Sequence, residues 1–548
     1  MSASSKKKLR NEQAAKKMTE KQLAEQKEAK KLKVYTAAFA IVMAVIVVAA
    51  AWFGISQAIS NSGLMERKTV AVTVGDHEIT NAELNYFYID SINNFYNNYG
   101  SYASLFGLDL TKSLDEQVTN EETGATWADD FIDSAIENAR SVYALADAAE
   151  AAGYTLSEDE QASVDSYVNS TMALYALYKG YSDAETYIKA LYGKGATQES
   201  FHDYYELNTL AKSYYNAYAE DLGYTADDLR AEDAENAALY SVYSYNYYYL
   251  NATKFREGGT TDEDGNVTYS DEEKAAAVTA CENAAKALTG EEINSVKLLD
   301  AAIDALSINA DTTASSTAID DYAYDSVTSV IRDWVTDASR VEGDKTYIAS
   351  TTTSTNDDGT ETETVNGYYV VYFRGSNDNN YPLANVRHIL VAYEGGTYDS
   401  STATTTYTDE EKAAAWETAT ELLNEWKAGE ATEESFAALA NEKSADSDGT
   451  DGGLYTDVYP GQMVTNFNDW CFAEGRTYGD TGLVQSEYGY HIMFYAGDSE
   501  TLYRDYLITE SLRSSDVDSW YNDLLDAMTA TEKNTKYISK DLVLSSAS

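Results

Sequence analysis

An internal duplication constrains the fold of this 548-residue chain more than any other feature. Residues 266–278, NVTYSDEEKAAAV, are matched by residues 403–416, ATTTYTDEEKAAAW. Further along, IRDWVTDASRVEGD at 331–344 is matched by FNDWCFAEGRTYGD at 467–480. Because the matches keep their order over more than 100 residues, they indicate one structural unit that is present twice.

Each copy predicts the same order of elements: a strand, a capped helix, further helices, and a closing pair of strands. The opening strands are YYYLNATKFREGG and NVRHILVAYEGG, and the closing strands are NGYYVVYFRGS and YGYHIMFYAGD. Both main helices begin with a capping box, Ser270 with Glu273 and Thr408 with Glu411. We therefore expect two compact α+β domains, a first repeat at 239–376 and a second repeat at 383–498.

The region before the repeats predicts a short hairpin followed by helices. Residues 70–80 read as two strands around Gly75-Asp76, and Thr80 with Glu83 forms a capping box. Three later breaks pair a glycine with a new helix start: Gly153 with Ser157, Gly180 with Ser182, and Gly223 with Thr225. We expect a helical domain at 70–238. The C-terminal segment, 499–548, predicts a helix at 515–528 and then a strand within 536–544.

An uncharged stretch of 22 residues, Val34–Ile55, precedes these domains. At about 1.5 Å per residue it would span roughly 33 Å, which is enough for a hydrocarbon core. Residues 1–33 hold 11 Lys/Arg and 4 Glu, so the positive-inside rule predicts a single-pass cell-membrane protein with a cytoplasmic basic tail. The bulk of the chain would then be extracytoplasmic. A cleaved signal peptide is the alternative.

The composition limits the kinds of partner that the chain could bind. The formal net charge is −52, and a strongly acidic exterior argues against nucleic acid as a partner.

Cys281 and Cys471 are the two cysteines; they could form one disulfide bridge, but two buried thiols fit better than a disulfide scaffold. Asp262, Asp264, Asn266 and Glu273 have calcium-loop spacing, yet Val267 occupies the place that needs glycine, which favours a solvated loop.

The residues that can carry chemistry gather in the second repeat. Of the four histidines, His388 and His491 fall there, each within an apolar strand pattern. A lone histidine in a strand is usually a packed core residue, whereas two of them at both ends of one sheet unit suggest a site. No histidine lies in the first repeat, where we align Asn251 with His388, Tyr369 with His491, and Ile331 with Phe467.

A series of motifs in the second repeat resembles parvulin-type prolyl isomerases. The series runs in family order over about 110 residues: RHILV at 387–391, FAALA at 436–440, Ser444-Ala-Asp446, Gly452-Gly453-Leu454, Gly461-Gln462-Met463, Phe467, and GYHI at 489–492. The family usually shows Gly-Gly-Asp-Leu-Gly where this chain has Gly452-Gly453-Leu454-Tyr455. From about residue 70 the chain resembles the PrsA and SurA foldases, whose members can carry two parvulin units, one of them inactive.

The resemblance implies a site and a function. His388, His491, Asp446 and Ser486 would be the polar catalytic residues, and Leu454, Met463 and Phe467 would line the pocket for the prolyl ring. No cofactor or metal is implied. The fold would be α+β and multidomain, with a transmembrane helix, a helical SurA-like chaperone domain and two parvulin-like domains, the first of them non-catalytic. Residues 499–548 would complete the helical domain, with Tyr537–Leu544 pairing to the 70–79 hairpin. Partners would be unfolded exported polypeptides with X-Pro bonds. A non-catalytic holding chaperone and a wall-spanning structural protein are the alternatives.

Overall fold

The computed structural model describes residues 4–13, 31, 42–50, 52–53, 59, 61–109, 112–310, 312–355, 359–446 and 451–540. Within these residues, no helix combines the length and apolar character needed to cross a bilayer. Half of the predicted membrane segment, 34–55, lies outside the described residues, which include 42–50 and 52–53 of it. The chain divides into two compact units, unit 1 with residues 1–222 and 515–548, and unit 2 with residues 223–514.

Unit 1 is built on a three-stranded antiparallel sheet covered by helices. The strand order is β17-β1-β2, with β1 at Val70–Val74, β2 at His77–Thr80 and β17 at Ala530–Glu532. A small hairpin, β3 and β4, spans Val118–Asn120 and Ala125–Thr126. The helices are α2 (Leu64–Lys68), α3 (Asn81–Tyr99), η1 (Gly100–Phe106), η2 (Leu114–Glu116), α4 (Trp127–Ala152), α5 (Glu158–Ser166), η3 (Tyr167–Thr171), α6 (Met172–Tyr178), α7 (Ala184–Tyr192) and α8 (Gln198–Asp221).

Capping explains most of the helix boundaries in unit 1. Thr80 and Glu83 form the predicted capping box, and α4 ends at Gly153, whose φ of 70° suits glycine. The prediction that Ser182 caps α7 is wrong: Asp183 is the cap, because its carboxylate accepts the Thr186 N–H at 2.8 Å. A charged carboxylate caps the positive end of a helix at least as well as a hydroxyl.

The C-terminal segment returns to unit 1, but through a different strand from the predicted one. Ala530–Glu532 pairs with β1, with Val72 opposite Glu532. Tyr537–Leu544 was expected in this place; of it, residues 537–540 form no strand and 541–548 lie outside the described residues. Ile538 instead inserts into the core of α3, α4 and the hairpin.

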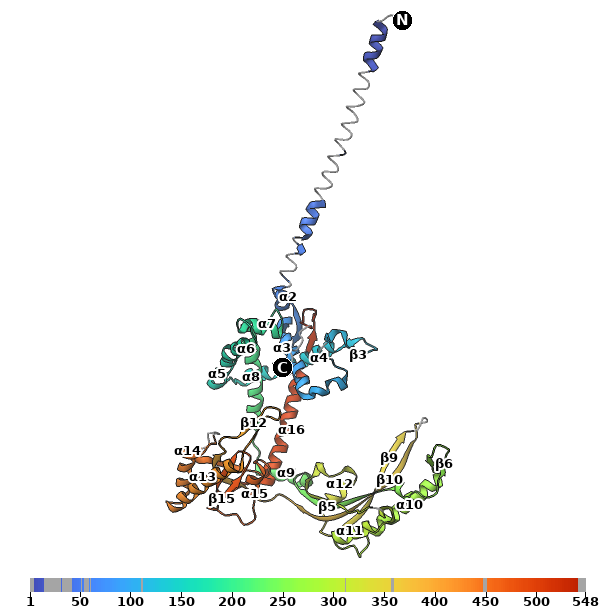
Figure 1. Ribbon diagram of the computed structural model, residues 1–548, viewed down its shortest axis with the longest axis vertical. Coiled ribbons are helices and arrows are strands. Elements are labelled where there is room, and N and C mark those ends of the chain that lie inside the picture. The colour runs from blue at the N-terminus through green and yellow to red at the C-terminus, as the bar shows by residue number, and fades with distance from the viewer. Residues whose placement is uncertain are drawn as a thin grey trace. The chain divides into compact units, whose positions relative to one another are not determined.

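A single helix, α16 (Tyr503–Ala527), leads into that strand (Figure 1). The expected helix start at Ser515 is absent, because α16 is continuous through this residue. Trp520 stacks on Tyr218 of α8 at a centroid distance of 3.7 Å, which fixes the last turns of α16 on unit 1.

Unit 2 contains the two repeats, and their sheets have the same order. The first repeat has β8-β5-β10-β9 and the second β14-β11-β16-β15. The first repeat comprises α9 (Ala226–Asn236), η4 (Ala237–Tyr240), β5 (Val242–Asn251), η5 (Ala252–Phe255), β6 (Thr260–Thr261), β7 (Val267–Thr268), α10 (Asp271–Leu288), α11 (Val296–Asp304), η6 (Ser307–Asn309), β8 (Thr317–Ala323), η7 (Tyr324–Ser326), α12 (Ser329–Val335), β9 (Lys345–Thr355) and β10 (Glu361–Asn377). The second has β11 (Pro382–Ala392), β12 (Thr397–Asp399), β13 (Thr404–Thr406), α13 (Asp409–Ala428), α14 (Glu433–Lys443), η8 (Asp451–Gly453), β14 (Leu454–Val458), α15 (Thr465–Cys471), β15 (Thr481–Gln485) and β16 (Gly489–Leu502).

A corner built from Trp, Arg, Gly and Asp recurs in both repeats. In the second, the Arg476 guanidinium lies 3.9 Å from the Trp470 ring centroid, and the Gly479 N–H donates to the Tyr495 carbonyl. In the first, the matching distance from Arg340 to Trp334 is 5.0 Å, and Gly343 donates to Phe373. The matched residues of the duplication therefore hold the same turn against the same strand in each sheet.

The tyrosine-rich run at 240–250 forms most of β5, which lies between β8 and β10 and is a central strand of its sheet. Both Cys281 and Cys471 are free and buried, as expected for thiols. Burial raises the pKa of Cys281 to about 11 and that of Cys471 to about 12.

Candidate active site

The sheet of the second repeat has two unlike faces. Ile389, Ile492 and Phe494 point to one face and pack against α13 and α14. His388 and His491 belong to the other face, because strand side chains alternate and the register places Leu390 opposite His491 and His388 opposite Met493. That second face is covered by α15 through Phe467 and Cys471. The two imidazoles are diagonal neighbours on adjacent strands, only 3% and 5% exposed.

A continuous series of polar contacts runs through the two rings. His388 Nδ1 lies 3.0 Å from His491 Nδ1. At one end, His388 Nε2 is 2.7 Å from Asp446 Oδ2. At the other end, the Ser486 hydroxyl lies 2.8 Å from His491 Nε2. The structure therefore brings together all four polar residues that the sequence singled out.

These distances give each ring nitrogen one partner. Burial lowers the pKa of His491 to about 4, with His388 acting in the same direction and Asp446 opposing it, so this ring is neutral at pH 7. The two Nδ1 atoms share one proton, His388 Nε2 faces the Asp446 carboxylate, and His491 Nε2 faces the Ser486 hydroxyl.

The loop after α14 places the carboxylate. The Leu390 N–H of β11 donates to Ser444 Oγ at 3.0 Å, and the Ala445 N–H donates to the Leu390 carbonyl at 2.8 Å. The loop is thus tied to the strand that carries His388, two residues away. The Tyr455 hydroxyl donates to Asp446 Oδ2 at 2.9 Å, so Asp446 has a partner on each side.

The apolar wall of the site differs from the prediction at one position. The Phe467 ring meets both imidazoles edge to face, with centroids 5.4 Å from each. Met463 is half-buried and packs on the same core. Leu454, however, pairs with Arg387 and so shares the face opposite to the histidines. Tyr455, which pairs with Val386, holds the place on the histidine face.

Tyr455 was missed although the sequence contained a signal for it. Counted from the glycine pair of the family pattern Gly-Gly-Asp-Leu, Leu454 stands at the Asp position and Tyr455 at the Leu position. Gly453 fixes this count in space: a Cβ there would lie 2.2 Å from the His388 carbonyl oxygen, so only glycine lets β14 approach β11 this closely.

The first repeat keeps the sheet and replaces both imidazoles with tyrosines. Its register places Gly367 opposite Asn251, as Gly489 lies opposite Ala392. Tyr369 therefore matches His491, as predicted. The residue that matches His388 is Tyr247 and not Asn251. The alignment on REGG and YEGG was wrong by four residues, because the short helix η5, Ala252–Phe255, is inserted after β5.

The distances at the histidine pair argue against a metal between the rings. Zn–N bonds are about 2.0–2.1 Å each, so a cation would need the two Nδ1 atoms farther apart than the observed 3.0 Å. The arrangement offers instead a buried pair of rings, a hydroxyl and a carboxylate beside an aromatic wall. Such a site orients hydrogen bonds without holding a strong nucleophile.

Comparison with known proteins gives a match to one family model and to solved structures. Residues 368–495 match the family model described as PPIC-type PPIASE domain. A comparison with curated proteins finds no match. Among solved structures, the peptidylprolyl isomerase PrsA from Bacillus anthracis is similar at 22% identity and a TM-score of 0.17, covering 27% of this chain and 59% of that protein. PrsA from Bacillus cereus is similar at 15% identity and a TM-score of 0.17, covering 61% of this chain and 86% of that one.

Proposed function

We propose that this chain, whose residues 368–495 match the model of PPIC-type PPIASE domains, is a foldase that catalyses cis/trans isomerisation of X-Pro bonds in unfolded polypeptides. The observation that carries the proposal is the unbroken series of contacts from Ser486 through His491 and His388 to Asp446. Phe467 borders this series on its apolar side.

The chemistry suits these residue types. Rotation about the X–Pro bond must overcome partial double-bond character with a barrier of about 18–20 kcal/mol. No covalent bond forms or breaks, so the site needs only to stabilise the twisted amide more than either planar form. Phe467 and Met463 supply apolar surface for the prolyl ring. The imidazoles, oriented by Asp446 and Ser486, set the hydrogen bonds around the amide without a proton-transfer role.

The test is the isomerisation rate of an X-Pro peptide, measured by NMR exchange with the whole chain. His388→Ala and His491→Ala should each slow catalysis by roughly a hundredfold, the scale of losing one preorganised polar group. Glu417→Ala, at an exposed position of α13 on the face of the sheet opposite to the histidines, is the surface control. If both histidine variants keep the parental rate, the second repeat only grips polypeptides and the enzymatic proposal falls.

A holding function in unit 1 is the second candidate. On α6, Leu174, Leu177 and Tyr178 are 63%, 74% and 81% exposed. Exposed apolar side chains grouped on one short helix are typical of surfaces that contact other proteins. We propose that this surface holds unfolded chains. Leu177→Asp should then weaken suppression of aggregation of an unfolded test protein while leaving the isomerisation rate unchanged.

We also propose that residues 34–55 anchor the chain in the cell membrane, with the basic tail inside and both repeats outside. The support is the uncharged stretch next to a tail with 11 Lys/Arg and 4 Glu. Extraction of membranes at high pH should leave the full chain in the pellet. Release of the protein into the soluble fraction, with residues 1–33 removed, would instead indicate a cleaved signal peptide.

A further inference from the structure

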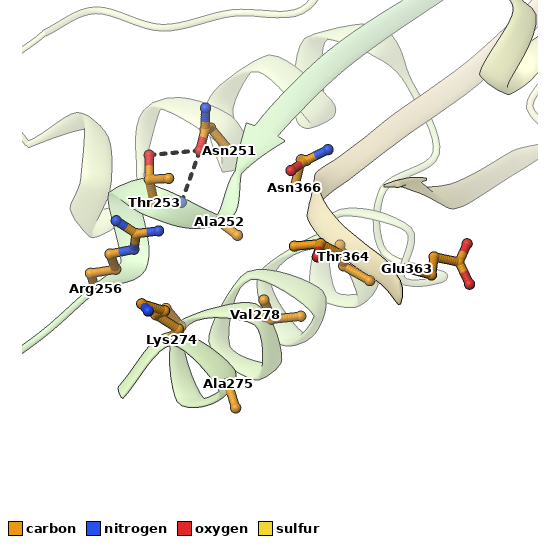
Figure 2. Close-up of a pocket in the computed structure, with 12 residues that line it drawn as sticks. Asn251, Ala252, Thr253, Arg256, Lys274, Ala275, Val278, Glu363, Thr364 and Asn366 are labelled. Carbon is orange, nitrogen blue, oxygen red and sulfur yellow. Dashed lines mark hydrogen bonds between the residues drawn. The ribbon is translucent and has the colours of Figure 1, made fainter. Parts of the chain in front are cut away.

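A cavity of about 650 Å³ lies in the first repeat, far along the sheet from the tyrosines that replace the histidines. Its walls come from three elements: the turn of η5, the first half of α10, and residues 363–366 of β10. This volume is within the range of roughly 300–1,000 Å³ that is usual for ligand pockets. Small and apolar side chains, among them Ala252, Ala275 and Val278, form its floor (Figure 2).

The cavity exists because β10 extends beyond the end of β5, one of its two neighbouring strands. On one side, pairing with β9 continues to Glu361 opposite Thr355. On the other side, pairing with β5 ends at Gly367 opposite Asn251, where η5 turns the chain away. In an antiparallel ladder, alternate residues direct their N–H and C=O groups away from a given neighbour. Residues 363–366 therefore present a strand edge to the cavity.

The second repeat has no counterpart of this edge. There β16 begins at Gly489, which pairs with Ala392, the last residue of β11, so neither strand extends past the other. The cavity is thus a property of the longer β9–β10 hairpin of the first repeat and not of the duplicated fold.

The charges around the cavity are separated. Figure 2 shows Arg256 and Lys274 at one end and Glu363 at the other. Arg256 also lies over the Tyr269 ring at 5.3 Å, and Lys274 pairs with Asp271 at 3.0 Å, so Arg256 is the cation at this end that forms no ion pair with the described residues. In a chain of net charge −52, such a basic end selects an acidic group of a partner.

We propose that this cavity is a second polypeptide-binding site, which takes an extended segment of an unfolded chain as an added strand on β10. An acidic side chain of the segment meets Arg256 and Lys274, and a basic side chain meets Glu363. Main-chain hydrogen bonds to residues 363–366 give affinity for any extended sequence, and the charges at the two ends set its direction. The proposal does not depend on the isomerase site and needs no proline.

The test uses the whole chain and a labelled probe, read by fluorescence anisotropy. The probe is a proline-free peptide of alternating Val and Thr, blocked at both ends, with one Asp near one end and one Lys near the other. Arg256→Glu should weaken binding about tenfold, the scale of one lost charge-assisted hydrogen bond, without changing the isomerisation rate. Lys254→Glu is the matched control, because Lys254 lies in the same helical turn but lines a neighbouring cavity.

Two further arms separate the parts of the proposal. A probe with Lys in place of Asp should bind Arg256→Glu more tightly than it binds the parent chain. N-methylation of alternate probe residues should abolish binding for one of the two alternating sets and spare the other. Equal losses for Arg256→Glu and Lys254→Glu, or indifference to both methylation patterns, overturn the proposal. A probe without Asp that binds only through a free C-terminal carboxylate also overturns it, in favour of capture of chain ends.

Discussion

The two repeats share strand order and a Trp–Arg–Gly–Asp corner, yet they differ where chemistry is expected. His388 and His491 of the second repeat correspond to Tyr247 and Tyr369 of the first, and Phe467 corresponds to Ile331. The scaffold residues are retained because each sheet must still bury its faces. The comparison teaches that the parvulin-like fold and the polar series at its centre are separable, since one persists without the other.

Truncating the matched aromatic and aliphatic residues gives the largest expected effect. Phe467→Ala and Ile331→Ala each empty a buried position and should cost roughly 3–5 and 2–5 kcal/mol of stability. Only Phe467→Ala should also reduce the isomerisation rate, by about a hundredfold, since Phe467 borders both imidazoles. Urea unfolding and NMR exchange on both variants measure the two effects. Equal loss of rate in both would break the assignment of catalysis to the second repeat.

Acidification should distinguish the two sheets next. Burial lowers the pKa of His491 from its ordinary value of 6.5 to about 4 in the folded chain. As pH falls, the unfolded chain therefore binds a proton at this histidine before the folded chain does. The free energy of unfolding is thus unaffected above about pH 6.5 and decreases between about pH 6.5 and pH 4, by up to roughly 3 kcal/mol. Hydrogen exchange should show β16 losing protection across this window more than β10. His491→Gln should abolish the difference.

The shared corner predicts a smaller effect of the same sign in both repeats. Arg476 lies closer to its tryptophan than Arg340 does, and its Nε also donates to the Trp470 carbonyl at 3.0 Å. Arg476→Ala should therefore destabilise its repeat by about 1–2 kcal/mol, and Arg340→Ala by about 1 kcal/mol or less. Thermal unfolding of the two variants checks the order. A reversed order would show that the ring contact and the Nε hydrogen bond do not determine the stability of this corner.

The smallest effect is expected at Tyr455, which has Ile319 as its counterpart in the first repeat. Tyr455→Phe removes one hydrogen-bond donor to Asp446 and keeps the ring, so the activation barrier of isomerisation should rise by about 1 kcal/mol. The isomerisation rate should fall less than tenfold, with unchanged thermal stability. A loss as large as that of a histidine variant would mean that Tyr455 contacts the substrate itself.

Much of the fold was predictable because the signals are local. The duplicated capping boxes, Ser270 with Glu273 and Thr408 with Glu411, begin α10 and α13 as expected. The 70–80 hairpin is also confirmed. For the site, the spacing of motifs was enough to select His388, Asp446, Ser486 and His491, which the structure brings within hydrogen-bonding distance of one another.

The errors arise where strand pairing, and not local pattern, decides the position. The four residues of η5 shift the alignment from Tyr247 to Asn251, since an inserted turn leaves the flanking glycines similar. One residue of register separates Leu454 from Tyr455 and places them on opposite faces. The strand Ala530–Glu532 is short and carries no alternating pattern, so only its pairing with β1 identifies it.

The pairing of β17 with β1 means that both repeats are inserted between the two parts of unit 1. During synthesis, every element of the repeats emerges before the residues that complete the first sheet. Each repeat can close its own sheet early through contacts within its own segment. The hairpin of unit 1 keeps an unpaired edge until residues 530–532 are synthesised, so this unit is the last to be completed. A chain that ends within α16 would therefore contain two folded repeats and an incomplete unit 1.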